Sequence, residues 1–524
     1  MNRLTRLSIL GAALCVALGA ALPAAAQSAA AAPIVAKPLD LKIHMHFRDK
    51  FVWNEEWPVA KEMTRMTNIR LVNTASKVAT NSTEAFNLLM ASGKLPDIVG
   101  GNSLKDEFIR FGMEGAFVPL NKLIDQHAPN LKAFLQKNPL IAQAITAPDG
   151  NIYYIPYVPD GSASRGWWIR QDWLDKLKLK TPQTVDELYE VLKAFRDRDP
   201  NGNGKKDEIP YFNGTPTEVY RLVLLWGGRS SGSNSAMDFM VDANGKVVHP
   251  FAQDGFKTGI KNVAKWYKEG LIDKEIFTRK SRAREQLFSA NLGGVTHDWF
   301  ASTSTYNQPS SMPSRVPGFK VIPMAPPADI NGKRFEEDSR KLVMPDGWAI
   351  SFSNKHPVET IKLFDFFFSE AGRRLSNFGV EGQQYTLKDG KPVFKDAVLK
   401  SATPVNSQLW EIGAQIPIGF PMDYSYEEQW TFPEGLKGRE MYIKGNYLLP
   451  QFPGVNMTKD ERAVYDKHWT DLETYMNVMA QNWVLGTKDV DATWAEYQAH
   501  LKKNGYDKVI AVMQKAYDRQ YKKP

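Results

Sequence analysis

The spacing of apolar residues predicts strands that alternate with helices. Every second residue is apolar between positions 39 and 47, which is the period of a strand with one buried face. A helix is predicted over 84–90, ended by Gly93, and a short buried strand over 95–101. Residues 152–157 form an aromatic strand or a crossing between lobes. Alternation at this spacing indicates an α/β fold with a largely parallel sheet.

The chain becomes more helical after Arg170. Thr184 and Glu187 have the spacing of a capping box, in which each side chain binds a free backbone N–H group, so a helix is predicted from Val185 to about Arg198. Further helices are predicted over 256–269, 357–368 and, almost without a break, 459–522.

The first 26 residues have the pattern of a secretory signal peptide. Two arginines precede an apolar stretch from position 10 to 22, and Ala24-Ala25-Ala26 has the small residues of a cleavage site. The only cysteine, Cys15, lies inside the apolar stretch, which does not favour a lipid anchor. We expect cleavage after Ala26 and a periplasmic protein without cysteine.

Length and charge narrow the class of protein. A chain of 524 residues suits two or three domains. Loss of the two leader arginines lowers the formal charge from +8 to +6, and the excess is spread along the chain. No basic stripe or nucleic-acid module is present, so nucleic-acid binding is not expected. The modest positive charge favours an anionic ligand only weakly.

Residues 199–208 match a calcium-binding loop. Oxygen-bearing side chains occupy its positions 1, 3 and 5, glycine position 6, and carboxylates positions 9 and 10. Ca²⁺ prefers about six to eight oxygen ligands, which alternate residues of a tight loop can supply. The loop departs from the EF-hand pattern because Pro210 occupies position 12, where a bidentate glutamate is usual. A metal-free turn is the alternative. The predicted ligands of one structural Ca²⁺ are Asp199, Asn201, Asn203, Lys205 (through its carbonyl), Asp207 and Glu208.

No segment of the sequence makes a convincing catalytic site. Ser230 lies in a G-x-S-x-G pattern, but a predicted helix precedes it where a hydrolase needs a strand, so we interpret the segment as a loop. His44 and His46 share one face of the first strand, for which a structural role is favoured over metal or ligand binding. Paired glycosidase carboxylates leave no sequence spacing, so a secreted glycan lyase or hydrolase stays an alternative.

Several longer segments resemble the extracellular solute-binding proteins of sugar ABC importers. They cover residues 95–98, 170–177, 266–273 and 516–520. The likeness is closer to the periplasmic alginate-binding proteins of that family. It rests on residues 42–50, 296–302 and 413–420 and on the loop 199–208, which in those proteins binds calcium.

The resemblance implies a two-lobed periplasmic binding protein fold of α/β type, with a hinge and a ligand cleft. We expect the signal peptide over 1–26 and the first lobe over 27–155. The second lobe is then expected over 156–300, with a return to the first lobe over 301–365 and a mostly helical remainder of the second lobe over 366–524.

The resemblance also implies a site and partners. Tyr157, Trp299 and Trp430 are implied as ring faces for sugars, with Lys50 and Glu427 as polar contacts. The expected ligand is alginate or a similar acidic oligosaccharide, delivered by a monomeric protein to the membrane subunits of an ABC importer. Pro421-Met422 and Trp167-Trp168 depart from the pattern of the alginate binders, which leaves another anionic or a neutral oligosaccharide as an alternative.

Overall fold

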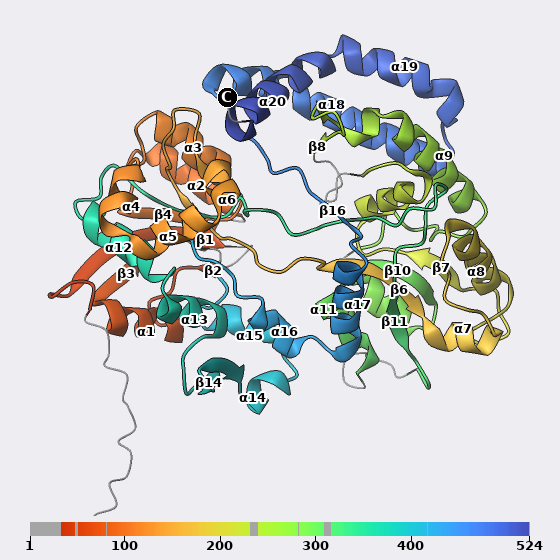
Figure 1. Ribbon diagram of the computed structural model, residues 1–524, viewed down its shortest axis with the longest axis horizontal. Helices are drawn as coiled ribbons and strands as arrows, with labels where there is room; N and C mark the ends of the chain where they lie inside the picture. Colours follow the sequence, from red (N-terminus) through yellow and green to blue (C-terminus); the bar gives the residue numbers. More distant parts are fainter. Residues whose placement is uncertain are drawn as a thin grey trace, which may run out of the picture.

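The computed structural model describes residues 33–47, 51–79, 81–230, 239–280, 282–308, 316–416 and 418–522. It has two lobes, each built around its own sheet and its own hydrophobic core (Figure 1). The fold is therefore the expected two-lobed α/β fold.

The first lobe contains a six-stranded mixed sheet, ordered β2-β1-β4-β13-β5, with β3 paired to the other end of β1. β1 is the predicted alternating strand, and its apolar residues are buried at the centre of the first core. The strands are β1 (Leu39–Phe47), β2 (Phe51–Val52), β3 (Ile69–Asn73), β4 (Ile98–Gly101), β5 (Ile155–Pro156) and β13 (Gly347–Ile350).

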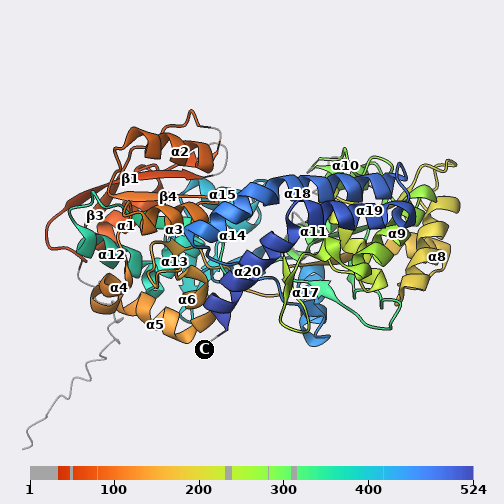
Figure 2. The ribbon, with the colours of Figure 1, turned by 90° about the horizontal axis from the view of Figure 1, so that it is seen from above.

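Helices cover this sheet and extend the lobe. Two of them, α12 and α13, come from the later part of the chain yet pack beside α1, α4 and α5 (Figures 1 and 2). The helices are α1 (Pro58–Thr67), α2 (Ser82–Ser92), α3 (Lys105–Met113), α4 (Asn121–His127), α5 (Pro129–Lys137), α6 (Pro139–Ile145), α12 (Pro357–Phe366), α13 (Glu370–Phe378), α14 (Asp396–Leu399), α15 (Val405–Glu411) and α16 (Ser425–Trp430), with a hairpin of β14 (Tyr385–Lys388) and β15 (Lys391–Phe394).

The second lobe contains a four-stranded sheet, ordered β11-β6-β10-β7. β6 pairs antiparallel with both β10 and β11, while β7 runs parallel to β10. The strands are β6 (Arg165–Arg170), β7 (Ile209–Phe212), β10 (Gly293–Trp299) and β11 (Val321–Met324), and the small pairs are β8 (Met240–Val241) with β9 (Val247–Val248) and β12 (Glu336–Glu337) with β16 (Leu448–Leu449).

The helices of this lobe include the three long C-terminal ones. They are α7 (Gln171–Leu177), α8 (Val185–Asp197), α9 (Asp254–Lys268), α10 (Ala283–Ser289), α11 (Phe300–Ser304), α17 (Pro433–Lys444), α18 (Lys459–Leu485), α19 (Val490–Lys503) and α20 (Tyr506–Tyr521), with 3₁₀ turns at η1 (Pro216–Trp226), η2 (Pro250–Ala252) and η3 (Thr305–Asn307). No helix in the described ranges is long and apolar enough to cross a membrane.

Local capping explains where α8 begins. The hydroxyl of Thr184 accepts the N–H of Glu187 at 3.2 Å, as predicted. The carboxylate of Glu187 accepts the N–H of Gln183 at 2.6 Å, one residue before the expected donor. Both bonds satisfy donors that the first turn of a helix leaves free.

The later lobe boundaries differ from the expected ones. Residues 301–365 were expected to return to the first lobe, but β11 at 321–324 pairs with β6 of the second sheet. Residues 366–524 were assigned to the second lobe, but the part up to Tyr426 packs into the first core, and only the helices from Pro433 onward join the second. Both boundaries were wrong because an amphipathic pattern shows that a helix has a buried face and not which core buries it.

Three segments that pass near the lobe junction lie side by side. The N–H of Tyr157 donates to the carbonyl of Asp346 at 3.0 Å, and the N–H of Met344 donates back to Tyr157 at 3.1 Å. The N–H of Val158 donates to the carbonyl of Phe420 at 3.0 Å. These hydrogen bonds tie the passing segments to the edge of the first sheet and form the expected hinge.

The C-terminal helices form a layer that reaches from the second lobe to the first (Figures 1 and 2). α18 packs on α9 of the second lobe and on α20. At the other end, the side-chain amide of Asn456 donates to the carbonyls of Ala144 and Thr146 at 3.0 and 2.7 Å, next to the end of α6. Arg462 also pairs with Asp106 of α3 at 2.6 Å. The layer thus contacts both lobes on one side of the molecule.

Candidate functional site

The loop 199–208 joins α8 to β7 and is shaped by its own side chains. The carboxylate of Asp199 accepts the N–H groups of Gly202, Asn203 and Gly204 at 2.8, 3.0 and 3.0 Å. Gly202 and Gly204 have φ values of +75° and +76°, which glycine adopts without strain. Asp199 therefore lies inside a tight turn whose backbone curls around its carboxylate.

Three carboxylates gather in this loop. The side-chain amides of Asn201 and Asn203 donate to Asp207 at 3.0 and 3.1 Å. The Oε1 atom of Glu208 accepts the N–H of Asn201 at 3.2 Å, while its Oε2 atom is buried without a hydrogen-bond partner. Burial, with smaller contributions from Asp199 and Asp207, raises the pKa of Glu208. A carboxylate oxygen that is buried, unpaired and surrounded by negative charge is suited to a cation.

The remaining donors in the loop are neutral oxygens. Across the described ranges, no group of three or more His, Cys, Asp or Glu side chains is already positioned to hold a metal ion. The carboxylates of Asp199, Asp207 and Glu208 are therefore not arranged as such a group, and the rest of the predicted shell consists of two amides and a backbone carbonyl. These residue types fit Ca²⁺, which is bound by oxygen from carboxylates, amides and carbonyls.

Trp299 lies at the junction of the lobes, at the end of β10. Its ring is half-buried, and the guanidinium groups of Arg165 and Arg340 lie 5.8 and 5.6 Å from its centroid. Arg165 starts β6, the neighbouring strand, whereas Arg340 lies on the passage back to the first lobe. The indole thus lies close to cations from two separate segments.

Glu427 lies on α16 in the first lobe and forms an ion pair with Arg340 at 2.5 Å. Both side chains are 10% exposed, so the pair is largely shielded from water. The Nε atom of Arg340 is buried without a hydrogen-bond partner. The structure therefore brings Glu427 and Trp299 to the same arginine, although the two residues belong to different lobes.

Tyr157 lies beside this group on the first passage between the lobes. Its hydroxyl donates to Gln415 at 3.3 Å, and its ring meets Phe420 edge-on at a centroid distance of 5.0 Å. Burial raises the pKa of Tyr157, an effect that Arg340 opposes and Glu427 adds to. Tyr157 is therefore close enough to both residues for their charges to affect its pKa.

Trp430 ends α16, three residues after Glu427, so both project from one face of a single turn. Its ring packs against the first core, and its Nε1 atom is buried without a hydrogen-bond partner. No ring contact joins it to Trp299 in the part of the chain that the structure describes. The fifth predicted residue, Lys50, lies outside the described residues.

Sequence reasoning named Lys50 but missed the arginines of this site. Besides Arg340, the guanidinium of Arg439 lies 4.0 Å from the ring centroid of Tyr424, and Arg340 lies 5.7 Å from the same ring. The positive excess of the chain was the only available signal, and 66 lysines and arginines spread along it gave no indication of which ones converge.

Buried ion pairs fix the strand that carries Trp299. Glu218 of η1 binds both Arg165 and Arg284, the latter at 2.6 Å, and Arg284 also reaches Asp298 at 3.3 Å. The arginines lower the pKa of Glu218 more than burial raises it, so its charge is retained. This network positions Arg165 beside the ring of Trp299.

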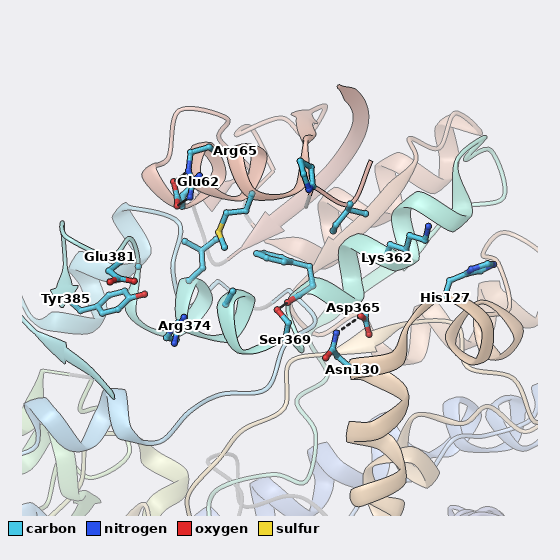
Figure 3. Close-up of a pocket in the computed structure, with 17 residues that line it drawn as sticks. Glu62, Arg65, His127, Asn130, Lys362, Asp365, Ser369, Arg374, Glu381 and Tyr385 are labelled. Carbon is cyan, nitrogen blue, oxygen red and sulfur yellow. Dashed lines mark hydrogen bonds and ion pairs between the residues drawn. The ribbon is translucent and has the colours of Figure 1, made fainter. Parts of the chain in front are cut away.

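The large cavity shown in Figure 3 lies elsewhere, within the first lobe. It measures about 950 Å³ and contains both acidic and basic groups, including Glu62, Arg65 and Arg374. None of the predicted sugar contacts lines it. Asp365 at its edge is already bound to Asn130 at 2.7 Å (Figure 3). It is therefore separate from the junction site.

Ser230, considered for catalysis, and His46, considered for metal or ligand binding, have structural partners. Ser230 is buried, its N–H donates to Glu337 at 2.9 Å and its hydroxyl to the same carboxylate at 2.5 Å. A 3₁₀ helix precedes it, as expected for a loop and not for a nucleophile elbow. His44 and His46 are buried in β1, and His46 contacts the carbonyl of Ala79 at 3.0 Å.

Comparison with known proteins places the chain among sugar-binding transport proteins. The solved structure of the alginate-binding protein AlgQ2 without calcium ion is 62% identical and superposes with a TM-score of 0.82, covering 93% of this chain and 99% of that one. The fructooligosaccharide ABC transporter substrate-binding protein FusA of Streptococcus pneumoniae serotype 4 is 30% identical over 83% of this chain and 82% of its own length.

Three further matches each cover part of the chain. The polygalacturonan/rhamnogalacturonan-binding protein YtcQ of Bacillus subtilis is 31% identical over 45% of each chain. Residues 460–523, the C-terminal helices, match a domain of unknown function. The model of the bacterial extracellular solute-binding protein family matches residues 67–374. The chain belongs to this family of bacterial extracellular solute-binding proteins, as the sequence segments predicted.

Proposed function

We propose that this protein captures alginate or an alginate-like acidic oligosaccharide between its lobes and delivers it to an ABC importer. The observation that carries the proposal is 62% identity, over 93% of the chain, to a structure of an alginate-binding protein. Ligand between the lobes would favour their closure, and the closed form would be presented to the importer.

The junction site suits a uronate chain. Pyranose rings have apolar C–H faces that pack on aromatic rings, and Trp299, Trp430 and Tyr157 would supply such surfaces. A uronate carboxylate needs a cationic donor, and Arg340 is the cation nearest to Trp299 that keeps an unused donor atom. Glu427 would then orient Arg340 and accept a sugar hydroxyl, with Lys50 as a further contact.

We propose that the loop 199–208 holds one structural Ca²⁺. Its support is the unpaired Oε2 atom of Glu208 and the closeness of three carboxylates in a loop of oxygen ligands. A bound ion would replace the amide contacts that now separate Asp207 from the other carboxylates. Because the loop leads directly into β7, whose neighbour β10 ends at Trp299, the ion would stabilise the sheet that supports the site.

The proposed role is binding and not catalysis, in a monomer exported to the periplasm after cleavage at Ala26. Purified protein incubated with alginate should release no new reducing ends and no unsaturated uronate. Mass spectrometry of the exported protein should find an N-terminus at or near Gln27 and no lipid on Cys15. A lipid-bearing chain starting at Cys15 would contradict this part of the proposal.

A neutral fructo-oligosaccharide is the second candidate ligand, favoured by the 30% identity to FusA. A thermal-shift screen separates the candidates, since a ligand that binds only the folded protein raises its melting temperature. Oligomannuronate and oligoguluronate should raise it in proportion to the logarithm of concentration, and kestose should not. A shift with kestose alone would replace the acidic ligand by the neutral one.

A further inference from the structure

A second cavity, of about 430 Å³, lies between the lobes beneath the C-terminal helices. The start of α3 lines it from the first lobe, and α18 and α20 line it from the second, as their positions in Figures 1 and 2 allow. The passage between the lobes at 341–345 and the segment 452–457, which leads into α18, complete the wall. None of the described residues proposed to contact sugar lines this cavity.

Lys105, the first residue of α3, carries an unneutralised charge in this cavity. The residue is 9% exposed, and its backbone N–H donates to the carbonyl of Pro345 at 2.9 Å. Within the described part of the chain, no hydrogen bond or ion pair involves its ammonium group. The nearest carboxylate, Asp106, is held by Arg462 at 2.6 Å. A buried charge without a partner is strongly unfavourable, so the site lacks a counter-charge.

The ionisable side chains that line the cavity leave one positive charge in excess. The cations are Lys105, Lys341 and Arg462, and the carboxylates are Asp106 and Glu473. One monoanion would balance the cavity. Burial is the main effect that lowers the pKa of Lys105; Asp106 opposes this effect, and Arg462 and Lys341 add to it, so an incoming anion would raise the pKa of this lysine and favour its charged form.

The rest of the wall is mostly apolar and consists of aromatic and aliphatic side chains. Tyr465 and Trp469 stack at a centroid distance of 5.6 Å, and Phe452 lines the cavity beside them. Cavities of about 300–1,000 Å³ with apolar walls and few polar groups are typical of small-molecule sites. We propose that this cavity binds a small organic carboxylate, of about the size of a sugar acid, with its carboxylate on the ammonium group of Lys105.

A ligand at this place would act on both lobes. It would bridge α3 and α18, which belong to different lobes. Lys341 lines the cavity and its neighbour Arg340 pairs with Glu427, so one passage serves both sites. By thermodynamic linkage, the carboxylate and a cleft ligand would change each other's affinity by the same factor.

Calorimetric titration with sodium D-glucuronate tests the proposal. Three variants are compared with the wild type: Lys105→Met, Trp299→Ala at the junction site, and Lys122→Met, an exposed lysine on α4, as the matched control. We expect saturable binding to the wild type, a loss of at least tenfold in affinity for Lys105→Met, and unchanged affinity for Lys122→Met, while Trp299→Ala reports any glucuronate that binds at the junction site instead. Glucose, which lacks the carboxylate, should not bind at this cavity.

Three results would overturn the proposal: no saturable binding of glucuronate to the wild type, equal affinity in Lys105→Met, or loss of binding in Trp299→Ala, which would place glucuronate in the cleft. Lys105→Met should melt at the wild-type temperature or above it without ligand, because it replaces an unpaired ammonium by an apolar group. A lower melting temperature would show that the ammonium has a partner in the protein, which also contradicts the proposal. The comparison of Lys105→Met with Lys122→Met does not depend on whether alginate is the cleft ligand.

Discussion

Replacement of Trp299 by alanine separates a ligand-binding residue from a residue of the core. The half-buried ring lies 5.8 and 5.6 Å from two guanidinium groups. Each such cation–π contact is worth about 0.5–1 kcal/mol at a site that water reaches. We therefore expect Trp299→Ala to lower the free energy of unfolding by about 1–2 kcal/mol.

The effect on binding should be at least as large. If a pyranose face packs on the indole, losing that surface should weaken oligosaccharide binding by roughly 1–3 kcal/mol, as judged from aromatic burial. Calorimetric titration gives the change in affinity, and urea denaturation of the same preparation gives the change in stability.

Trp168 provides the matched control on the adjacent strand. It is 0% exposed, and its ring packs near Phe300 at a centroid distance of 5.9 Å. Trp168→Ala should lose about 3–5 kcal/mol of stability, as for other deleted core rings. Its affinity for oligosaccharide, measured on folded protein, should change little. Unchanged affinity in a strongly destabilised Trp299→Ala protein would refute the assignment of Trp299 to the sugar site.

Three further predictions concern the calcium loop, the ion pair between Arg340 and Glu427, and the buried His44. Chelation should lower the melting temperature, elemental analysis should find one calcium per chain, and Glu208→Gln should reduce the response to added calcium; protein without calcium and without such a response would contradict the metal site. Both side chains of the pair are 10% exposed, and Glu427→Gln leaves the charge of Arg340 unpaired. We therefore expect urea denaturation to show a free energy of unfolding lower by about 3 kcal/mol. The loss should be smaller in the double variant that also carries Arg340→Met. Burial, assisted by His46, lowers the pKa of His44 from 6.5 to about 4, so the stabilisation from its neutral form is complete above pH 6.5 and falls as pH approaches 4. Between pH 7 and 5 the protein should lose about 2 kcal/mol from this residue, and His44→Gln should flatten the stability profile; an unchanged profile would show that His44 is not the titrating group.

Local sequence patterns predicted helices and strands well where a single pattern, such as strict alternation or a terminating glycine, was clear. The alternation over 39–47 and the glycine at position 93 placed β1 and the end of α2, because both depend on neighbouring residues only. The loop 199–208 is equally visible, since its ligand candidates are contiguous. The calcium itself stays a prediction.

The sequence did not predict which sheet or core the later segments of the chain join. β11 joins the second sheet and α13 the first core, and nothing in either segment distinguishes the two destinations. The group around Trp299 combines residues 165, 340 and 427, which are far apart in sequence and meet only after both lobes have formed. Resemblance to a family identified the aromatic members, while the arginines required the structure.

Titration of the mature protein with alginate oligosaccharides of defined length is the direct test of binding between the lobes. We expect saturable binding of one oligosaccharide per chain, weakened in Arg340→Met and in Trp299→Ala, with the alginate chemically intact afterwards. Absence of binding by folded, calcium-loaded protein, or tight binding of kestose in its place, would contradict it.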